Sequence, residues 1–439
     1  METPNLAMEL GRASRGTWEL RYEFLTGPVF LLHGRLAGAN IGAQAQPWWA
    51  GRRNPGRLHG DNDKTVSRSQ PSKKTAMNPV LKDIRQNPLL WLLVFVPVVL
   101  VAAKLKPEAE TLLFVLSVLA IVPLTVLLSH ATEAVAAKTG DAVGGLLNAT
   151  LGNLAELIIA LAALRAGQYM LVKASIAGPI VTNTLFILGA SFLFGGLKHH
   201  EQEYNRVSAR LQSGMLFLAT VALLIPSAIS HADTAGVAFS HKLSVGLAVL
   251  LIVAYALGML FTLKTHKEMF GSVSHAAPGQ KPWPMGLALA TLGAVTVLVA
   301  LVSEIFVESV QKAAETFGMT PAFVGFIIVA LVGGASAMPT AFSGALKNRL
   351  DLSVGIALGS SSQIALFVAP VLVLLSYVIG PTPMDLQFWP GAVVMLFMAT
   401  ITTSLVTSSG RSAWFVGVLV LMVYLIFAMT LYLLPPRAQ

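Results

Sequence analysis

Eleven apolar runs, each close to the length of a membrane-spanning helix, follow one another between residues 89 and 434. A helix that crosses the hydrocarbon core of a bilayer needs about 20 mostly apolar residues. Backbone polar groups find no water there, so such runs fold as helices or as pieces of helices. We therefore predict an all-α polytopic membrane protein with spans at 89–106, 111–137, 142–164, 169–196, 211–229, 243–263, 285–310, 319–345, 353–378, 387–407 and 412–434.

The composition agrees with this class and excludes others. Only 12% of the 439 residues are charged, against about 25% in soluble domains. The net charge of +9 falls on an N-terminal arm and on short gaps between apolar runs, so no nucleic-acid partner is expected. The absence of cysteine excludes thiolate metal sites. The chain has no HExxH motif and no phosphate-binding loop, so neither an enzyme nor an ATP-driven pump is indicated.

Residues 1–77 differ from the rest of the chain. They are polar and basic, and their apolar stretch, Phe24–Leu32, is too short to span and is interrupted by a Gly-Pro pair. It also lacks the layout of a secretory signal. We predict a disordered basic arm ahead of a transmembrane domain over residues 78–434. Translation from Met77, directly before the first span, is the alternative.

The loops between the runs differ in charge. Loops on the same side as the start of the first span carry more Lys and Arg than loops on the other side. Basic loops stay in the cytoplasm, so we predict a cytoplasmic N-terminus and a C-terminus outside. The short loops favour a bacterial inner membrane. The chain contains no signal of its oligomeric state, and its surroundings are expected to be the lipid bilayer.

The chain also contains an internal repeat. Val143–Leu157 and Val324–Met338 share a valine, an alanine and two glycines at an offset of 181 residues, and the same offset relates Gly178 to Gly359. The repeated spans are five apart, so they cross the membrane in opposite directions. Inverted repeats are a common build of secondary transporters, whose ion sites lie near the midplane. We predict an inverted five-plus-five repeat, with one extra N-terminal helix and halves at about 111–264 and 285–434.

Glu156 is the strongest candidate for an ion site. It lies near the centre of the third predicted span, three residues after Asn153 and four after Gly152. Acidic residues at this depth are expensive and usually functional, and a glycine allows local unwinding that frees backbone carbonyls. A carboxylate, an amide oxygen and carbonyl oxygens are the ligands that Ca²⁺ takes. The alternative is a protonated Glu156 that makes one hydrogen bond between helices.

Other polar residues of the spans are weaker candidates. Glu133 lies towards the cytoplasmic end of the second span, and Glu304 and Glu308 lie one turn apart near the outer end of the seventh. They could be entry and exit acids, or they could be solvated at the headgroup level. Asn183 and Gln363, which follows Ser360–Ser362, add oxygens at similar depth, although small polar residues often serve only helix packing.

At this point the sequence resembles a known family. The segments ATE (Ala131–Glu133), TGDAVGGLLNATLGNLAELIIAL (Thr139–Leu161) and ALGSSSQIALFV (Ala357–Val368) are similar to the signatures of the cation/Ca²⁺:H⁺ exchangers of the calcium/cation antiporter superfamily. The resemblance covers the chain from about residue 80 to its end.

This resemblance implies eleven helices, no permanently bound cofactor, and exchange of Ca²⁺ for H⁺ driven by the proton gradient. Glu156 would bind Ca²⁺ or a proton in turn, with Asn153 beside it. Glu133, Glu304 and Gln363 would be supporting residues. The loosened backbone of the second half would lie at Gly333 and Gly334.

One departure from the family pattern affects the mechanism. The family has a glutamate in the eighth span where this chain has Ala337. A single carboxylate leaves bound Ca²⁺ with a net positive charge, which is costly in a low-dielectric site. Three outcomes are open: Glu304 supplies the second carboxylate, the ion is monovalent, or this chain is a paralogue that has lost transport. A channel is a further alternative, which would follow the electrochemical gradient of Ca²⁺ alone.

Overall fold

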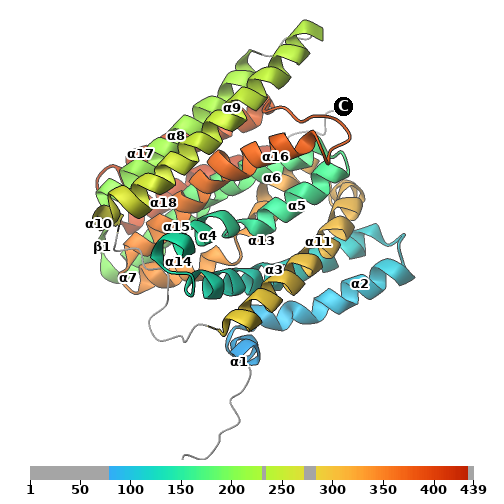
Figure 1. Cartoon of the computed structure of the whole chain (residues 1–439), viewed down its shortest axis with the longest axis horizontal. Helices are drawn as coiled ribbons and strands as arrows, with labels where there is room; N and C mark the ends of the chain where they lie inside the picture. The colour runs from blue at the N-terminus through green and yellow to red at the C-terminus, as the bar shows by residue number, and fades with distance from the viewer. Residues whose placement is uncertain (1–78, 230–233, 271–282, 434–439) are drawn as a thin grey trace, which may run out of the picture. The chain divides into compact units, whose positions relative to one another are not determined.

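The computed structural model describes residues 79–229, 234–270 and 283–433. All of them belong to one of the two compact units of the chain, Lys73–Gln439. The predicted basic arm, residues 1–77, lies outside the described residues. The described part consists of helices and one two-stranded sheet (Figure 1), as expected for an all-α membrane protein.

The elements, in chain order and including one 3₁₀-helix (η1) and four π-helical segments (η2–η5), are α1 Pro79–Gln86, η1 Pro88–Val94, α2 Phe95–Leu105, α3 Glu110–Ala136, α4 Asp141–Leu151, α5 Leu154–Arg165, α6 Tyr169–Val181, η2 Thr182–Ile187, α7 Leu188–His199, β1 Glu201–Glu203, α8 Arg206–Ala228, α9 Thr234–Leu260, η3 Phe261–Thr265, α10 Lys267–Phe270, α11 Met285–Thr316, α12 Pro321–Phe323, η4 Val324–Val329, α13 Ala330–Gly333, α14 Ala337–Leu346, α15 Leu350–Gln363, η5 Ile364–Val368, α16 Ala369–Ser376, α17 Pro390–Thr407, β2 Arg411–Ala413 and α18 Trp414–Leu433.

Nine stretches of the described residues are single helices that are long and apolar enough to cross a membrane. They coincide with nine of the eleven predicted spans. The other two predicted spans, 142–164 and 319–345, are formed by pieces of helices. The first is divided into α4 and α5. The second bends by 66° between Val324–Gly333 and Ala337–Leu346.

Glycines explain where the two runs break. Gly152 lies directly after α4, and Gly333 and Gly334 lie at the end of α13. Glycine is a poor helix former because it has the most backbone freedom to lose. Asn153 then has non-helical dihedral angles and precedes the first turn of α5. In each of these two spans, one helix ends and another begins near the middle of the span.

The two halves share further irregularities at the repeat offset. The π-helical segments η2 and η5 begin at Thr182 and Ile364, one in the fourth predicted span and one in the ninth. A π-helical turn contains an extra residue and often marks a functional site. The breaks in the third and eighth spans are also about 181 residues apart. The repeat predicted from the sequence therefore has a counterpart in backbone geometry.

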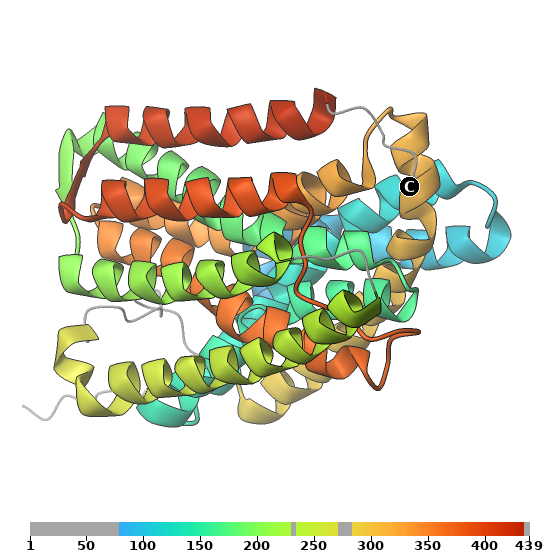
Figure 2. The ribbon, with the colours of Figure 1, turned by 90° about the horizontal axis from the view of Figure 1, so that it is seen from above.

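Helices of the two halves pack against each other in matching pairs. α3 packs on α11, α8 on α17 and α15 on η2, while α7 packs on α18 and α9 on α16. Figure 1 shows α2, α3 and α11 on one side of the described unit and α8, α9 and α17 on the opposite side. The broken helices lie between these groups. In Figure 2, seen from above, α17 and α18 (orange-red and red) run side by side.

Two sets of polar contacts tie the connections of the halves together. β1, between α7 and α8, pairs antiparallel with β2, between α17 and α18, and places Gln202 opposite Ser412. At another connection, Lys173 Nζ on α6 lies 2.6 Å from Asp385 Oδ1 in the segment between α16 and α17. These contacts fix loops of the second half on helices of the first.

Candidate ion-binding site

Glu156 occupies the first turn of α5 and is buried, with 7% of its surface exposed. Among the described residues, Glu156 is the only Asp, Glu, Lys or Arg whose side chain is buried. The N-terminus of a helix carries a partial positive charge that stabilises a nearby carboxylate. Nevertheless, a buried carboxylate without a cation is strongly disfavoured. The position therefore suits a group that binds either a proton or a cation.

The Glu156 side chain lies directly against the break in the other half. A Cβ atom at Gly333 would lie 3.0 Å from Glu156 Cγ and 3.1 Å from Glu156 Oε1. Such distances are shorter than ordinary van der Waals contacts, so a methyl group at this position would force the Glu156 side chain to shift by a few tenths of an ångström. The break between α4 and α5 and the break after α13 therefore meet at the Glu156 carboxyl group. The sequence analysis expected loosened backbone at these glycines, and the structure brings the two breaks together.

A chain of hydrogen bonds connects the neutral candidates. Asn153 Nδ2 donates to Gln363 Oε1 at 2.7 Å, and Ser360 Oγ donates to Asn153 Oδ1 at 2.7 Å. Asn183 Nδ2 in turn donates to Ser360 Oγ at 3.0 Å. This polar network, defined by these four residues, joins the start of α5, the π-helical segment η2 and the end of α15.

Ser360 is the member of the polar network that the sequence reasoning did not select as a site residue. The available signal was its place in a run of three serines directly before Gln363. Serines within helices can donate to the backbone carbonyl four residues earlier, as Ser361 Oγ does by donating to the carbonyl of Ala357 at 2.8 Å. Pattern alone therefore could not distinguish the serine that faces Asn153 from its neighbours.

The second half contributes backbone rather than charge at the equivalent position. Ala337 begins α14 and is half-buried. Gly334 stands where the first half has Asn153, and a Cβ there would lie 3.1 Å from the Met338 side chain. The second half therefore contributes no carboxylate at the position equivalent to Glu156, where it has Ala337. Among the described residues, no three Asp, Glu or His side chains gather at one place.

Two predicted acids lie at a different place from Glu156. Glu304 is exposed on α11, and its Oε1 lies 3.2 Å from Arg165 Nη1 at the end of α5. Arg165 follows Glu156 by nine residues, which corresponds to about 13.5 Å along a helix. Glu308 is exposed one turn further along α11. Neither acid is brought to Glu156, so Glu304 is not the second carboxylate in this conformation.

Glu133 is exposed on α3, and its Oε1 accepts a hydrogen bond from Ser129 Oγ at 3.3 Å. It therefore differs from Glu156 in lying at the surface of the described unit. This placement is compatible with its predicted role as an entry acid, which stays a prediction.

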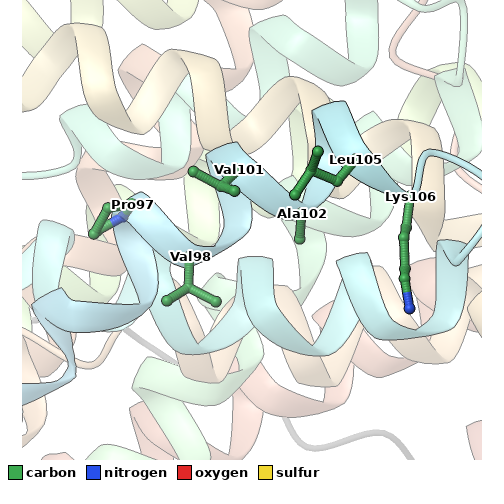
Figure 3. Close-up of a pocket in the computed structure, with 6 residues that line it drawn as sticks. All are labelled: Pro97, Val98, Val101, Ala102, Leu105 and Lys106. Carbon is green, nitrogen blue, oxygen red and sulfur yellow. The ribbon is translucent and has the colours of Figure 1, made fainter.

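An apolar hollow on the first span is unrelated to this chemistry. It is lined by residues of α2 and by the residue that follows it, namely Pro97, Val98, Val101, Ala102, Leu105 and Lys106 (Figure 3). Exposed apolar side chains are expected on a helix that faces lipid. The candidate ion site is instead a buried cluster of oxygen atoms between broken helices.

The fold and the site define an integral membrane protein of the cation-exchanger class. The sequence matches the family described as "Sodium/calcium exchanger protein" over residues 109–264 and 287–433, one segment in each half. The chain belongs to this family, which is a family of transporters.

Individual relatives and solved structures agree with this assignment. The chain is 38% identical to a "Ca(2+)/H(+) antiporter" of Aphanothece halophytica, covering 78% of this chain and 96% of the relative. It is 38% identical to the "Ca(2+)/H(+) antiporter ChaA" of Bacillus subtilis, covering 79% and 100%. The solved structure of native YfkE has a TM-score of 0.68 at 35% identity and covers 79% of this chain and all of that chain. The predicted polytopic exchanger fold is confirmed.

Proposed function

We propose that this protein exchanges Ca²⁺ for H⁺ across a membrane and that the two ions compete for Glu156. The observation that carries the proposal is the buried Glu156 side chain against Gly333, where two broken helices meet. A buried carboxyl group is stable when it is protonated or when a cation neutralises it. Binding of Ca²⁺ therefore releases the proton, and binding of the proton releases Ca²⁺. The names of the relatives in Aphanothece halophytica and Bacillus subtilis support this pair of ions.

The polar network would supply the neutral ligands. Ca²⁺ takes six to eight oxygen atoms at about 2.3–2.6 Å. Asn153 Oδ1 and Gln363 Oε1 each accept a hydrogen bond within the network. We propose that these hydrogen bonds hold the two amide oxygens in position when no ion is bound. When Ca²⁺ binds, it takes the place of the hydrogen-bond donors on these oxygens. Backbone carbonyls at the ends of α4 and α13 would complete the shell, as unwound segments do in other transporters.

These carbonyls also offset the missing second carboxylate. The C-terminal end of a helix carries a partial negative charge, and both α4 and α13 end at the breaks beside Glu156. Two such ends reduce the uncompensated charge of a dication bound by one carboxylate. With these two helix ends, a chain with Ala337 in place of an acid can still bind Ca²⁺.

We further propose that the membrane is a bacterial inner membrane, with the N-terminus in the cytoplasm and the C-terminus outside. The excess of Lys and Arg in loops on the N-terminal side supports this orientation. The loop between α7 and α8 and the loop between α17 and α18, which carry β1 and β2, would then lie on the cytoplasmic side.

The test is Ca²⁺ uptake into proteoliposomes under an imposed pH gradient. The unmodified chain is expected to take up Ca²⁺, and a protonophore is expected to stop it. Glu156→Gln is expected to lower uptake by about a hundredfold or more, because the amide can neither neutralise Ca²⁺ nor carry the proton. Glu108→Gln, a change at an exposed acid outside the spans, is the matched control.

Three results would contradict the proposal. Uptake by Glu156→Gln at the rate of the unmodified chain would remove Glu156 from the mechanism. Ca²⁺ uptake that continues at the same rate after the protonophore is added would indicate a channel. No uptake by the unmodified chain, together with uptake by Ala337→Glu, would identify a paralogue that has lost transport.

A further inference from the structure

The half-helix that precedes the second break, formed by α12 and η4, packs closely on α6. A Cβ atom at Gly178 on α6 would lie 2.4 Å from the carbonyl oxygen of Phe326 and 2.6 Å from its Cα. A Cβ atom at Gly325 on η4 would likewise lie 2.5 Å from the Ala174 Cβ. Glycines at these two places thus let the backbones of η4 and α6 approach each other.

The first half contains the residues for the same packing. At the repeat offset of 181 residues, the corresponding positions lie on α4 and α15, and all four of them are glycines. Gly144, Gly145, Gly355 and Gly359 correspond in this order to Gly325, Phe326, Ala174 and Gly178. Small residues on both helices allow a close approach of their backbones. The sequence therefore allows α4 to pack on α15 as η4 packs on α6.

In the structure, however, α4 packs mainly on α3 and η3. A Cβ atom at Gly145 would lie 2.8 Å from the side chain of Leu263 on η3. Among the described residues, a Cβ atom at Gly359 would meet only one side-chain atom within 4 Å, at 3.6 Å. Leu146 on α4 is 47% exposed, whereas its counterpart Ile327 is 7% exposed. The glycine face of α15 is therefore not packed as the equivalent face of α6 is.

α6 and α15 themselves are held in similar ways. Lys173 Nζ on α6 lies 2.6 Å from Asp385 Oδ1, and Asp351 Oδ1 on α15 accepts a hydrogen bond from the backbone N–H of Asn205. Each of these two helices is thus tied near its start to a segment that connects other helices, and the two also pack on each other. The difference between the halves therefore lies in the half-helices that precede the two breaks.

We propose that α4 has a second position on α15, in which Gly145 lies on Gly359 as Phe326 lies on Gly178 in this structure. An inverted repeat has two equivalent arrangements, because each half can adopt the packing that the other half has. In the second arrangement α4 packs on α15, and α12 and η4 leave α6. Both half-helices lead to the breaks beside Glu156, so their alternation covers the ion site from one side at a time. This inference rests on the proposed exchange of Ca²⁺ for H⁺.

The experiment compares Gly359→Ala with the unmodified full chain by thermal unfolding, by calorimetric Ca²⁺ binding and by Ca²⁺ uptake into proteoliposomes. The added methyl group has room in the present arrangement but would press on the α4 backbone in the second one. Thermal stability is expected to stay close to that of the unmodified chain, and Ca²⁺ affinity within about twofold of it. Uptake is expected to fall at least about tenfold. Gly214→Ala on α8, where a Cβ atom has no neighbour within 4 Å, is the matched control and should retain all three.

A further measurement does not depend on transport. The chain has no cysteine, so Leu146→Cys on α4 and Val207→Cys on α8, both at exposed positions, give two unique sites for spin labels. Because α8 packs on α15, movement of α4 onto α15 changes the distance between the labels. Across Ca²⁺-free, Ca²⁺-loaded and acidic conditions, the labelled chain is expected to show two distances. With Gly359→Ala added, only the distance of the present arrangement is expected.

The outcomes separate this inference from the proposed function. Uptake by Gly359→Ala at the rate of the unmodified chain overturns the second position of α4 and leaves the exchanger intact. Loss of uptake together with Ca²⁺ binding or stability also overturns it, because the methyl group would then disturb the present arrangement. If the unmodified chain shows no uptake, the proposed function is overturned and the label distances alone decide. A single distance that Gly359→Ala leaves unchanged overturns the second position, and two distances that it reduces to one support it.

Discussion

The third and eighth spans are both interrupted at glycines, but different side chains follow the two breaks. In the first half, the break at Gly152 is followed by Asn153 and Glu156, which supply an amide and a carboxylate. In the second half, the equivalent positions are Gly333, Gly334 and Ala337, which supply space. The structure uses this space, because the Glu156 side chain lies against Gly333. One half therefore provides the charged ligand, and the other provides the gap that holds it.

This difference shows that the two halves of a repeat can share backbone geometry although they contribute different side chains to the site. Both halves keep the helix break and the π-helical segment one span later. The polar network, however, takes Asn153 and Asn183 from the first half and Ser360 and Gln363 from the second. A symmetric backbone thus supports an asymmetric site. Substitutions at four places in the two halves test this asymmetry.

The largest effect is expected at Gly178 and Gly359, the pair of glycines that the repeat places one span after the two helix breaks. A Cβ at Gly178 would lie 2.4 Å from the backbone oxygen of Phe326, whereas a Cβ at Gly359 meets only Gln212 Oε1 at 3.6 Å. Backbone atoms cannot move aside cheaply, so Gly178→Ala should destabilise the protein by about 3 kcal/mol. Gly359→Ala should change stability by less than about 1 kcal/mol. Thermal unfolding of the purified protein in detergent measures both, and equal losses would show that the two halves pack alike here.

The second effect tests the gap beside Glu156. A methyl group at Gly333 would force the Glu156 side chain to shift by a few tenths of an ångström, so Gly333→Ala should weaken Ca²⁺ binding about tenfold without preventing folding. The measurement is the Ca²⁺ concentration for half-maximal uptake. The control is Gly293→Ala on α11, where a Cβ has no neighbour within 4 Å. Unaltered Ca²⁺ affinity in Gly333→Ala would mean that this contact is not part of the binding geometry.

The third effect restores an acid to the second half. Ala337 lies in the first turn of α14, where the helix N-terminus stabilises a carboxylate. Ala337→Glu should therefore strengthen Ca²⁺ binding by up to about tenfold, because a second carboxylate neutralises the dication. Ala337→Gln has the same shape without the charge and should not do so. If the two variants bind Ca²⁺ equally, residue 337 does not face the ion.

The smallest effect is expected at the exposed acid Glu304. Its ion pair with Arg165 lies at the surface, with about half of the Glu304 side chain exposed. Exposed ion pairs contribute at most about 1 kcal/mol. Glu304→Gln should therefore lower the free energy of unfolding by less than about 1 kcal/mol and should change Ca²⁺ uptake by less than about twofold. Uptake and unfolding are measured as for the other variants. A loss comparable to that of Glu156→Gln would return Glu304 to the site as a second carboxylate.

The sequence by itself determined the class of the protein and the approximate position of its spans, and it indicated Glu156 as the candidate acid of an ion site. Apolar runs of this length have few solutions in a bilayer, and an acidic residue in the middle of such a run is costly. The offset of 181 residues predicted an internal repeat. These inferences depend on local pattern and on transfer energies, which a sequence contains.

Only the tertiary structure decided which residues meet. Apolar helices in lipid have no amphipathic face that fixes their rotation, and small residues allow several packings. Sequence reasoning therefore grouped Glu304 with Glu156, although the fold places Glu304 beside Arg165, and it did not select Ser360 for the polar network. The close approach of Glu156 to Gly333 depends on two helices that are far apart in the chain, so it follows from three-dimensional packing and not from sequence pattern.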